Sequence, residues 1–342
     1  MVVLIGEENS KRTHFMAQAA EKEAVPLRIM SWDRLQQEWE QLPEGAVVKI
    51  DPPSYRTVHL CHMQKQLGEY QHRLENLSQT GCRFLNAPEA ICRTLDKRQS
   101  KLCLQESGVA VTQMFSGQLQ TMEQLTALMR QRHCYSVFIK PRYFSGAAGV
   151  AAFRIHPVLG KMKLYTSCCL EKGQLINTKR IFTLENTSEI ENILDALSAL
   201  DCIVEKWHPK AAFHGKSYDL RVVYQFGHIA YSVVRQSKGP ITNLHLNNQA
   251  LAVENLGLDE ETMSRIFLLC RQAVSCFPGL SMAGIDVMLE KDSNRPLIIE
   301  MNGQGDLIYQ DIYHQNSIYR EQIQWMERWS DGGEWDKSGQ YE

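Results

Sequence analysis

The sequence predicts an α/β (α+β) chain in which a small α/β unit precedes two units dominated by antiparallel strands. The first ninety residues alternate short apolar strands with helical stretches, the order of a parallel βαβ sheet. Later apolar segments come in neighbouring pairs joined by short turns, which indicates antiparallel pairing. A length of 342 residues, 44% of them hydrophobic, is ample for two or three compact units.

The N-terminal α/β unit is predicted over residues 1–89. It opens with the strand "VVLIG" and a helix over Ser10–Glu23, followed by the strand "VPLRIM" and a helix near Trp32–Gln41. The segment "AVVKIDPPSY" predicts a third strand that ends in an Asp-Pro-Pro turn. The polar stretch Leu60–Gln79 predicts a long exposed helix, and the unit ends near Pro88.

A central unit is predicted over residues 90–207. It begins with a helix through Lys97 and Leu104 and continues with the strand "SVFIK" and a Gly-rich loop. The strand pair "GVAAFRI" and "KLYTSCCL", a helix over Ser188–Leu200 and the strand "CIVEKW" complete it.

The last unit is predicted over residues 208–329. The strands "YDLRVVYQF" and "HIAYSVVRQS" form a hairpin that turns at Gly227, and a helix over Glu260–Ser275 leads to the strands "GIDVMLE" and "PLIIEMN". The polar tail, residues 330–342, is expected to be flexible.

Composition narrows the classes of function. The formal net charge is −2 with acids and bases interspersed, so no basic stripe favours a nucleic-acid partner. No apolar segment has the length of a membrane span or of a signal peptide, so we expect a cytoplasmic protein without a membrane partner. The ten cysteines contain no C-x-x-C pair and are interpreted as reduced, structural thiols. A homo-oligomer is compatible with the sequence.

The stretch "SVFIKPRYFSGAAGV" predicts a phosphate site. A strand delivers Lys140, and the loop that follows has only small side chains, so its N–H groups can approach phosphate oxygens. The alternative is a plain hairpin loop of small residues. The loop consists of Ser145, Gly146, Ala147, Ala148 and Gly149. Valine at Gly146 or Gly149 is expected to abolish turnover with a near-normal melting temperature.

Two consecutive apolar strands near the C-terminus end in oxygen-bearing side chains. The turn "KDSNR" between them would bring Asp286 beside Glu300 and Asn302. Carboxylates together with substrate phosphates are the usual ligands of Mg²⁺, so the set predicts a nucleotide triphosphate and a metal. The alternatives are a salt-bridged Asp286 and a strand-end turn in which Asn302 serves only backbone geometry.

The order of these motifs resembles the ATP-grasp superfamily, and more closely its RimK-like carboxylate-amine ligases, over about residues 90–320. The resemblance implies an ATP-grasp fold of two α+β subdomains clasping ATP, preceded by a small α/β domain. Lys97, in "TLDKRQSK", and Lys140 resemble the phosphate-binding lysines, with Lys101 as a second candidate for the first position.

The other site residues follow from the same resemblance. Glu205, Lys206 and Trp207 are similar to the linker strand that recognises adenine, and Asp219 to the ribose-binding acid. Arg235 is the implied catalytic arginine and Asn243 lies near the phosphates. Arg221 is a second candidate catalytic arginine, its alternative role being a salt bridge to Asp219. Asp286, Glu300 and Asn302 fall on the magnesium ligands.

The implied activity joins a carboxylate to an amine through an acyl phosphate, with ATP, two Mg²⁺ ions or Mn²⁺, and release of ADP and phosphate. The carboxylate and amine belong to small molecules or peptides. A kinase of a small-molecule hydroxyl and a non-catalytic nucleotide-binding subunit are the alternatives.

Two stretches depart from the family's pattern. "HPKAAFHGKS" is extra between Glu205 and Asp219, and either covers the adenine or lengthens a loop. After Asn302, "GQGDLIYQDIYHQN" replaces a small-residue turn. Asp306 and Tyr309, with His314, are therefore expected to bind substrate, and Asp306 to orient a cationic amine.

Overall fold

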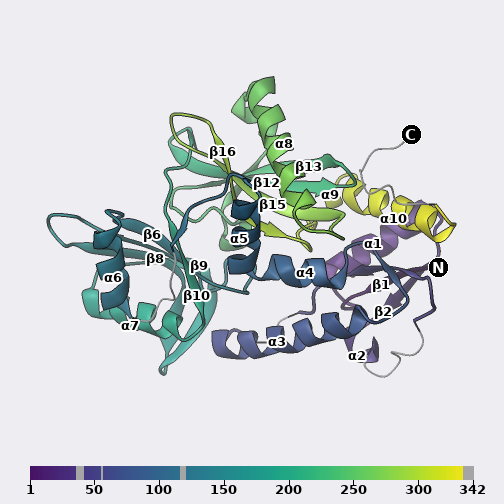
Figure 1. Ribbon diagram of the computed structural model, residues 1–342, viewed down its shortest axis with the longest axis horizontal. Coiled ribbons are helices and arrows are strands. Elements are labelled where there is room, and N and C mark those ends of the chain that lie inside the picture. The colour runs from purple at the N-terminus through teal and green to yellow at the C-terminus, as the bar shows by residue number, and fades with distance from the viewer. Residues whose placement is uncertain (36–41, 55–56, 116–120, 334–342) are drawn as a thin grey trace.

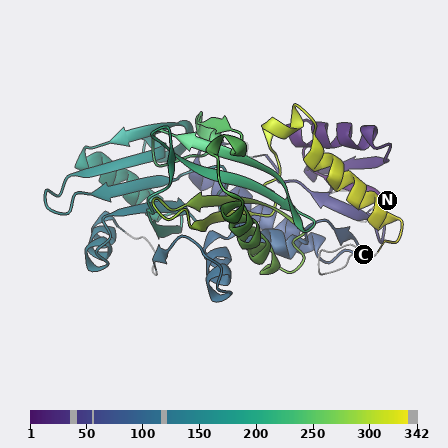
Figure 2. The ribbon, with the colours of Figure 1, turned by 90° about the horizontal axis from the view of Figure 1, so that it is seen from above.

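The computed structural model describes residues 1–35, 42–54, 57–115 and 121–333 and contains three sheets. The central sheet lies at one end, the N-terminal unit at the other, and the C-terminal sheet between them (Figure 1). Figure 2 shows the same order from above. Of the helix predicted near Trp32–Gln41, residues 36–41 lie outside the described residues, as do residues 334–342 of the predicted flexible tail.

The N-terminal sheet is parallel, as the βαβ pattern predicts, with the order β2-β1-β3-β4. Its strands are β1 (Val2–Ile5), β2 (Leu27–Met30), β3 (Val47–Ile50) and β4 (Arg83–Phe84). The helices of this part of the chain are α1 (Lys11–Lys22), α2 (Trp32–Leu35) and α3 (Leu60–Leu77).

Alternation along β1 divides its side chains between two layers. Val3 and Ile5 pack in the cluster that contains the apolar side of α3, whereas Val2 and Leu4 pack with α1. The second layer also contains α10 (Ser317–Ser330), from the far end of the chain, which lies beside α1 (Figure 1). The unit limits placed at residues 89, 207 and 329 stay predictions.

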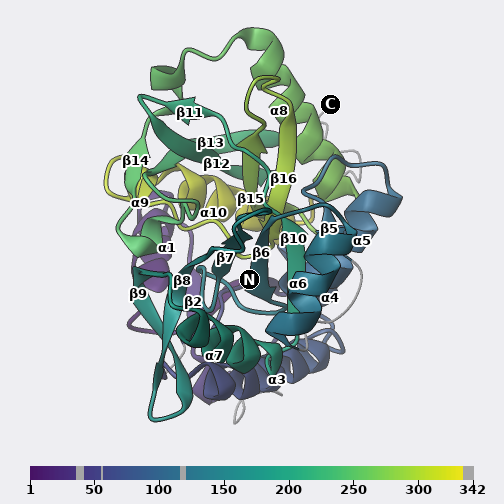
Figure 3. The same cartoon turned by 90° about the vertical axis from the view of Figure 1, so that its left-hand side faces the viewer.

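The central sheet is antiparallel, with the order β5-β10-β6-β7-β8-β9. Its strands are β5 (Met114–Phe115), β6 (Ser136–Pro141), β7 (Ala151–Ile155), β8 (Met162–Glu171), β9 (Gln174–Leu184) and β10 (Cys202–Lys206). α7 (Thr187–Ser198) lies along β8 and β9 with α6 (Met122–Gln131) beside it (Figure 3). β9 was not predicted from the sequence, because its centre, "NTKR", interrupts the apolar alternation.

The helix predicted through Lys97 and Leu104 is confirmed as α5 (Lys97–Glu106), and a separate helix, α4 (Pro88–Leu95), precedes it. The two helices are separate because Asp96 takes an extended backbone conformation and caps α5. Its carboxylate accepts hydrogen bonds from the backbone N–H groups of Arg98 and Gln99. The cap places Lys97 at the first turn of the new helix.

The C-terminal sheet is also antiparallel, with the order β14-β13-β12-β15-β16 and β11 paired to β12. Its strands are β11 (Ala212–Phe213), β12 (Lys216–Gln225), β13 (His228–Ser237), β14 (Gln249–Leu251), β15 (Met282–Leu289) and β16 (Pro296–Asn302). α8 (Glu260–Ser275) packs on β15 and β16, and the short helices are η2 (Leu244–Leu246), η3 (Val253–Leu256) and α9 (Tyr309–Ile312).

The two hairpins predicted in this unit are confirmed. β12 and β13 turn at Phe226 and Gly227, both at positive φ, and β15 pairs with β16 so that Asp286 is opposite Glu300. The extra stretch "HPKAAFHGKS" contains β11 and the start of β12 and thus extends this sheet. In the described parts of the chain, no helix is long and apolar enough to cross a membrane.

Candidate active site

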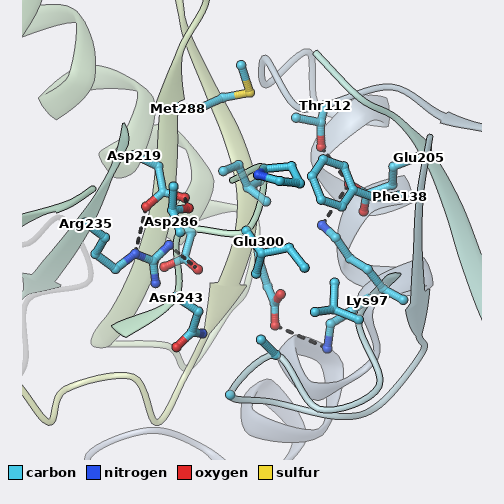
Figure 4. Close-up of a pocket in the computed structure, with 18 of the residues that line it drawn as sticks. Lys97, Thr112, Phe138, Glu205, Asp219, Arg235, Asn243, Asp286, Met288 and Glu300 are labelled. Atoms are coloured by element: carbon cyan, nitrogen blue, oxygen red, sulfur yellow. Dashed lines mark hydrogen bonds and ion pairs between the residues drawn. The ribbon is translucent and has the colours of Figure 1, made fainter. Parts of the chain in front are cut away.

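A pocket lies between the central and C-terminal sheets, and residues of both sheets line it (Figure 4). Asp219, Arg235 and Asp286 lie on one side, and Lys97, Glu205 and Phe138 on the other. Most predicted site residues line this pocket: Lys97, Lys140, Gly146, Ala147, Glu205, Lys206, Asp219, Arg221, Arg235, Asn243, Asp286, Glu300 and Asn302.

Charges alternate across the C-terminal side of the pocket. Pairing of β12 with β13 and β15 sets Asp219 opposite Arg235, and Arg221 opposite Asp286. Arg235 binds Asp219 Oδ1 through Nε at 2.7 Å and Asp286 Oδ2 through Nη2 at 2.9 Å. Arg221 Nε lies 2.9 Å from Asp286 Oδ1, so its salt-bridge partner is Asp286 rather than Asp219. Arg235 therefore connects the predicted ribose-binding acid to a predicted metal ligand.

Lys210 is a pocket residue that was not predicted from the sequence. Its Nζ donates to Asp219 Oδ2 at 2.9 Å and to Thr242 Oγ1 at 2.8 Å. Burial alone would raise the pKa of Asp219, but Arg235 and Lys210 outweigh it and hold that pKa well below its usual range. Lys210 lies in "HPKAAFHGKS", where no periodic pattern marked it, so the extra stretch contributes to the pocket lining.

On the side of the pocket formed by the central sheet, the Glu205 carboxylate binds two lysines and a threonine. Its carboxylate lies 2.7 Å from Lys101 Nζ and 3.0 Å from Lys140 Nζ, and it accepts a hydrogen bond from Thr112 Oγ1 at 3.0 Å. Burial alone would raise the pKa of Glu205, but Lys101 and Lys140 lower it to about 2. Burial also lowers the pKa of Lys101 to about 8 against the attraction of Glu205. Thr112 was another residue missed from the sequence.

Lys97 and Lys101, the two candidates for the first phosphate-binding lysine, differ in whether they line the pocket. Lys97 lines the pocket, donates to the Phe144 carbonyl oxygen and lies 3.2 Å from Glu300 Oε1. Lys101 is buried beneath Glu205 and is not part of the pocket lining. The geometry thus favours Lys97.

The pKa of Glu205 leads to a pH-dependent stability. Because the folded-state pKa is about 2 and the ordinary value is 4.5, the unfolded chain takes up this proton first as the pH falls. The contribution, about 3 kcal/mol, is present above pH 4.5 and is lost toward pH 2. We expect the free-energy difference of unfolding between wild type and Glu205→Gln, from urea titrations, to shrink as pH falls from 6 to 3.5. A constant difference would contradict this.

Two carboxylates and one amide suit a hard cation. Pairing of β15 with β16 sets Asp286 opposite Glu300 and Gly284 opposite Asn302, and the three oxygen-bearing side chains line one pocket. Asp286 Oδ1 is buried and has an ion pair but no hydrogen bond, so one lone pair is available. Within the described residues, no cluster of three His, Cys, Asp or Glu could hold a metal, and the third ligand here would be the amide.

The Gly-rich loop is only partly in the pocket. Gly146, Ala147 and Ala148 line it, whereas Ser145 and Gly149 are not in its lining. A Cβ added to Gly149 would lie 2.8 Å from Pro141 Cγ and 3.2 Å from Leu60 Cδ1. The expected near-normal melting temperature of a valine variant is therefore wrong at Gly149, because this position is packed against the fold.

Gly149→Ala should lower the free energy of unfolding more than Gly160→Ala does. Both glycines have positive φ, 67° and 66°, so both substitutions carry the same backbone strain. Only Gly149 meets neighbouring atoms, whereas nothing lies within 4 Å at Gly160. We expect an extra loss of about 1–3 kcal/mol at Gly149, measured by denaturant titration. Equal losses would mean that packing there is loose.

Four other predicted residues lie outside the pocket lining, and one of them, His314, is exposed. Trp207 packs behind Phe138, with ring centroids 5.5 Å apart, and supports the pocket wall from outside. Tyr309 is exposed and stacks on Tyr313. Asp306 is fully buried and pairs with cations of the N-terminal unit. The predicted orientation of a substrate amine by Asp306 does not fit this placement, because both of its oxygens are already bound.

No protein-family model and no curated protein matches the chain. Solved structures do match it. D-cycloserine synthetase DcsG matches with TM-score 0.63 and 13% identity over 96% of this chain and 99% of its own. The macrocyclase MdnC bound with precursor peptide MdnA, from Microcystis aeruginosa MRC, matches with TM-score 0.62 and 14% identity over 96% and 100%. D-alanine–D-alanine ligase from Bacillus anthracis, complexed with ATP, has TM-score 0.57 and 12% identity over 98% and 99%.

At these identities the similarity shows the fold. The ATP-grasp ligase PsnB, complexed with minimal precursor, also matches, with TM-score 0.58 and 13% identity over 96% of this chain and 98% of its own. The chain therefore has the ATP-grasp fold over nearly its whole length, which confirms the fold class predicted from the sequence.

Proposed function

We propose that the protein is an ATP- and Mg²⁺-dependent carboxylate-amine ligase of the RimK-like kind that releases ADP and phosphate. One observation supports this most. The facing pair Asp286 and Glu300, with Asn302, shares a pocket with Lys97 and Lys140. Oxygen ligands for a hard cation beside two lysines match the needs of a bound triphosphate.

The pocket offers separate environments for the parts of ATP. Phe138, Ile241 and Met288 provide an apolar region for the base, next to Glu205 and Lys206 of β10. Lys97 and Lys140 provide positive charge for the phosphates, and the loop Gly146–Ala148 brings small residues over them. The resemblance assigns the ribose to Asp219, which shares its oxygens with Arg235 and Lys210.

Asp286, Glu300 and Asn302 would hold two Mg²⁺ ions, or Mn²⁺ instead, because their oxygens come from neighbouring strands and face one pocket. Such ions supply charge neutralisation for the phosphates during transfer. Lys97 and Arg221 pair with these carboxylates and so balance their charge. Both cations line the pocket and can also contact a phosphate.

The chemistry consists of two displacements. A substrate carboxylate oxygen attacks the γ-phosphorus of ATP, ADP leaves, and an acyl phosphate forms. An amine nitrogen then attacks the acyl carbon, loses a proton and expels inorganic phosphate, so the amide retains one oxygen of the carboxylate. Arg235 and Arg221, which line the pocket, are the proposed stabilisers of the oxyanion formed in the second step. The Gly-rich loop would exclude water, which would hydrolyse the acyl phosphate.

The substrates are proposed as a carboxylate and an amine carried by small molecules or peptides. ADP release should be screened with purified protein, MgATP and pooled carboxylates and amines, followed by mass spectrometry of the products. A ligase gives an amide only when both pools are present. A phosphorylated hydroxyl compound would instead identify a kinase, and ATP binding without ADP formation a nucleotide-binding subunit.

A further inference from the structure

The segment that follows Asn302 is bound by side chains of the N-terminal unit. Arg12, on α1, donates to Asp306 Oδ1 through Nη1 and to the Gln304 carbonyl oxygen through Nη2 at 2.9 Å. Lys49, on β3, lies 3.1 Å from Asp306 Oδ2. Burial alone would raise the pKa of Asp306, but Lys49 and Arg12 hold it well below its usual range, so the carboxylate stays charged.

Gln304 anchors the same segment with its side chain. Tyr70, on α3, donates to Gln304 Oε1 at 3.0 Å, and Gln304 Nε2 donates to the carbonyl oxygen of Ile50 at 2.9 Å. Gln304 is only 4% exposed and Asp306 is 0% exposed. Elements more than 200 residues away in the chain therefore hold the Gln304 side chain, and Asp306 has the distant partners Arg12 and Lys49 together with Gln322, whose Nε2 donates to Oδ2 at 3.3 Å.

The same segment, Gln304–Asp306, also contacts residues that line the pocket. The backbone N–H of Gln304 donates to Asn302 Oδ1 at 2.8 Å and thereby orients the amide. Gly305 packs on Gly284 so closely that a Cβ at residue 284 would lie 2.1 Å from the Gly305 carbonyl oxygen. A Cβ at residue 305 would lie 2.8 Å from Arg221 Nη1. The segment Gln304–Asp306 thus contacts a predicted metal ligand on one side and a pocket arginine on the other.

We propose that Asp306 is a positioning residue of the metal site. Arg12 and Lys49 hold Asp306, Arg12 in turn fixes the backbone of Gln304, and the Gln304 N–H orients the Asn302 amide, which would be a ligand of Mg²⁺. The N-terminal unit therefore sets the orientation of a predicted metal ligand that belongs to the C-terminal sheet. This inference rests on the proposed function, because it requires MgATP in the pocket.

The test uses the full-length protein and measures binding of a non-hydrolysable ATP analogue by calorimetry while Mg²⁺ is varied. Asp306→Asn keeps the shape of the side chain and removes its charge. We expect the Mg²⁺ concentration for half-maximal stimulation of nucleotide binding to rise by roughly 10–100-fold, the usual loss when a residue that orients a metal ligand is changed. Analogue affinity without Mg²⁺ should change by less than about threefold, because the phosphate lysines are untouched.

A second variant keeps the test decisive if Asp306→Asn does not fold. Arg12→Lys retains the charge and loses the two-pronged contact with Asp306 and Gln304, and the Arg12 side chain is 19% exposed, so folding should survive. It should also raise the Mg²⁺ requirement.

The matched control is Asp311→Asn. Asp311 is equally buried, but it binds Ser317 and the start of α10. We expect it to lose stability without a change in the Mg²⁺ requirement.

The outcomes separate this inference from the proposed function. Wild-type protein that binds no nucleotide with Mg²⁺ would overturn both. If the wild type binds MgATP and folded Arg12→Lys and Asp306→Asn keep the wild-type Mg²⁺ requirement, the positioning role is wrong and the proposed function stands. An equal shift in Asp311→Asn would also overturn the role, because it would reflect lost stability alone.

Discussion

Glu300→Gln should reduce turnover by roughly a thousandfold in a protein that still folds. A metal at this site contributes several kcal/mol to transition-state stabilisation, and about 4 kcal/mol corresponds to that factor. Glutamine keeps the size of the side chain but provides one neutral oxygen and leaves Lys97 without its carboxylate partner. The change should therefore remove a metal ligand and leave the β15–β16 pairing intact, as measured by ADP formation and circular dichroism.

Glu23→Gln is the matched control for this variant. Glu23 is also a partly buried carboxylate bound to a cation, Arg320, and it lies in the N-terminal unit away from the pocket. We expect it to lower stability slightly and to leave turnover unchanged. Full activity of folded Glu300→Gln would remove Glu300 from the metal site.

Lys140→Met should weaken ATP binding by roughly 10–100-fold, since a charge-assisted hydrogen bond to a phosphate contributes about 1.5–3 kcal/mol. The protein should remain folded because Glu205 keeps Lys101 and Thr112 as partners after the substitution. Calorimetry with ATP and Mg²⁺ measures the change.

Lys163→Met provides the control for lost lysine charge. Lys163 is on β8 of the same sheet and pairs with Glu185 at the surface, so its removal should not affect ATP binding. If both variants bound ATP like the wild type, Lys140 would be only a structural partner of Glu205.

Local patterns in the sequence predicted the strands that carry the site. The turn "KDSNR" joins two apolar runs of similar length and sets the register next to it, and a β-bulge between Asp286 and Val287 then brings Glu300, rather than Ile299, opposite Asp286. The hairpin at Gly227 likewise joins β12 to β13, and a register shift between Val223 and Tyr224 brings Arg235 opposite Asp219. Short turns between adjacent strands leave few alternative partners, so the pairing of these strands could be predicted, whereas the bulge that sets Arg235 opposite Asp219 could not.

Contacts between distant segments could not be predicted in this way. Asp306 follows the predicted metal ligand Asn302 by four residues, and this closeness in sequence suggested a role in substrate binding. Its partners, Arg12 and Lys49, are more than 250 residues away, and no local pattern connects them to it. Lys210 was missed for the same reason, because its contact with Thr242 depends on how β11 folds back on β12.

The most direct test of the proposed ligase follows oxygen from the carboxylate once a substrate pair is found. With both carboxylate oxygens labelled as ¹⁸O, attack on the γ-phosphorus followed by amide formation predicts one labelled oxygen in the released phosphate and one in the amide. Unlabelled phosphate, or a γ-phosphoryl group retained on a hydroxyl product, would contradict the acyl-phosphate mechanism.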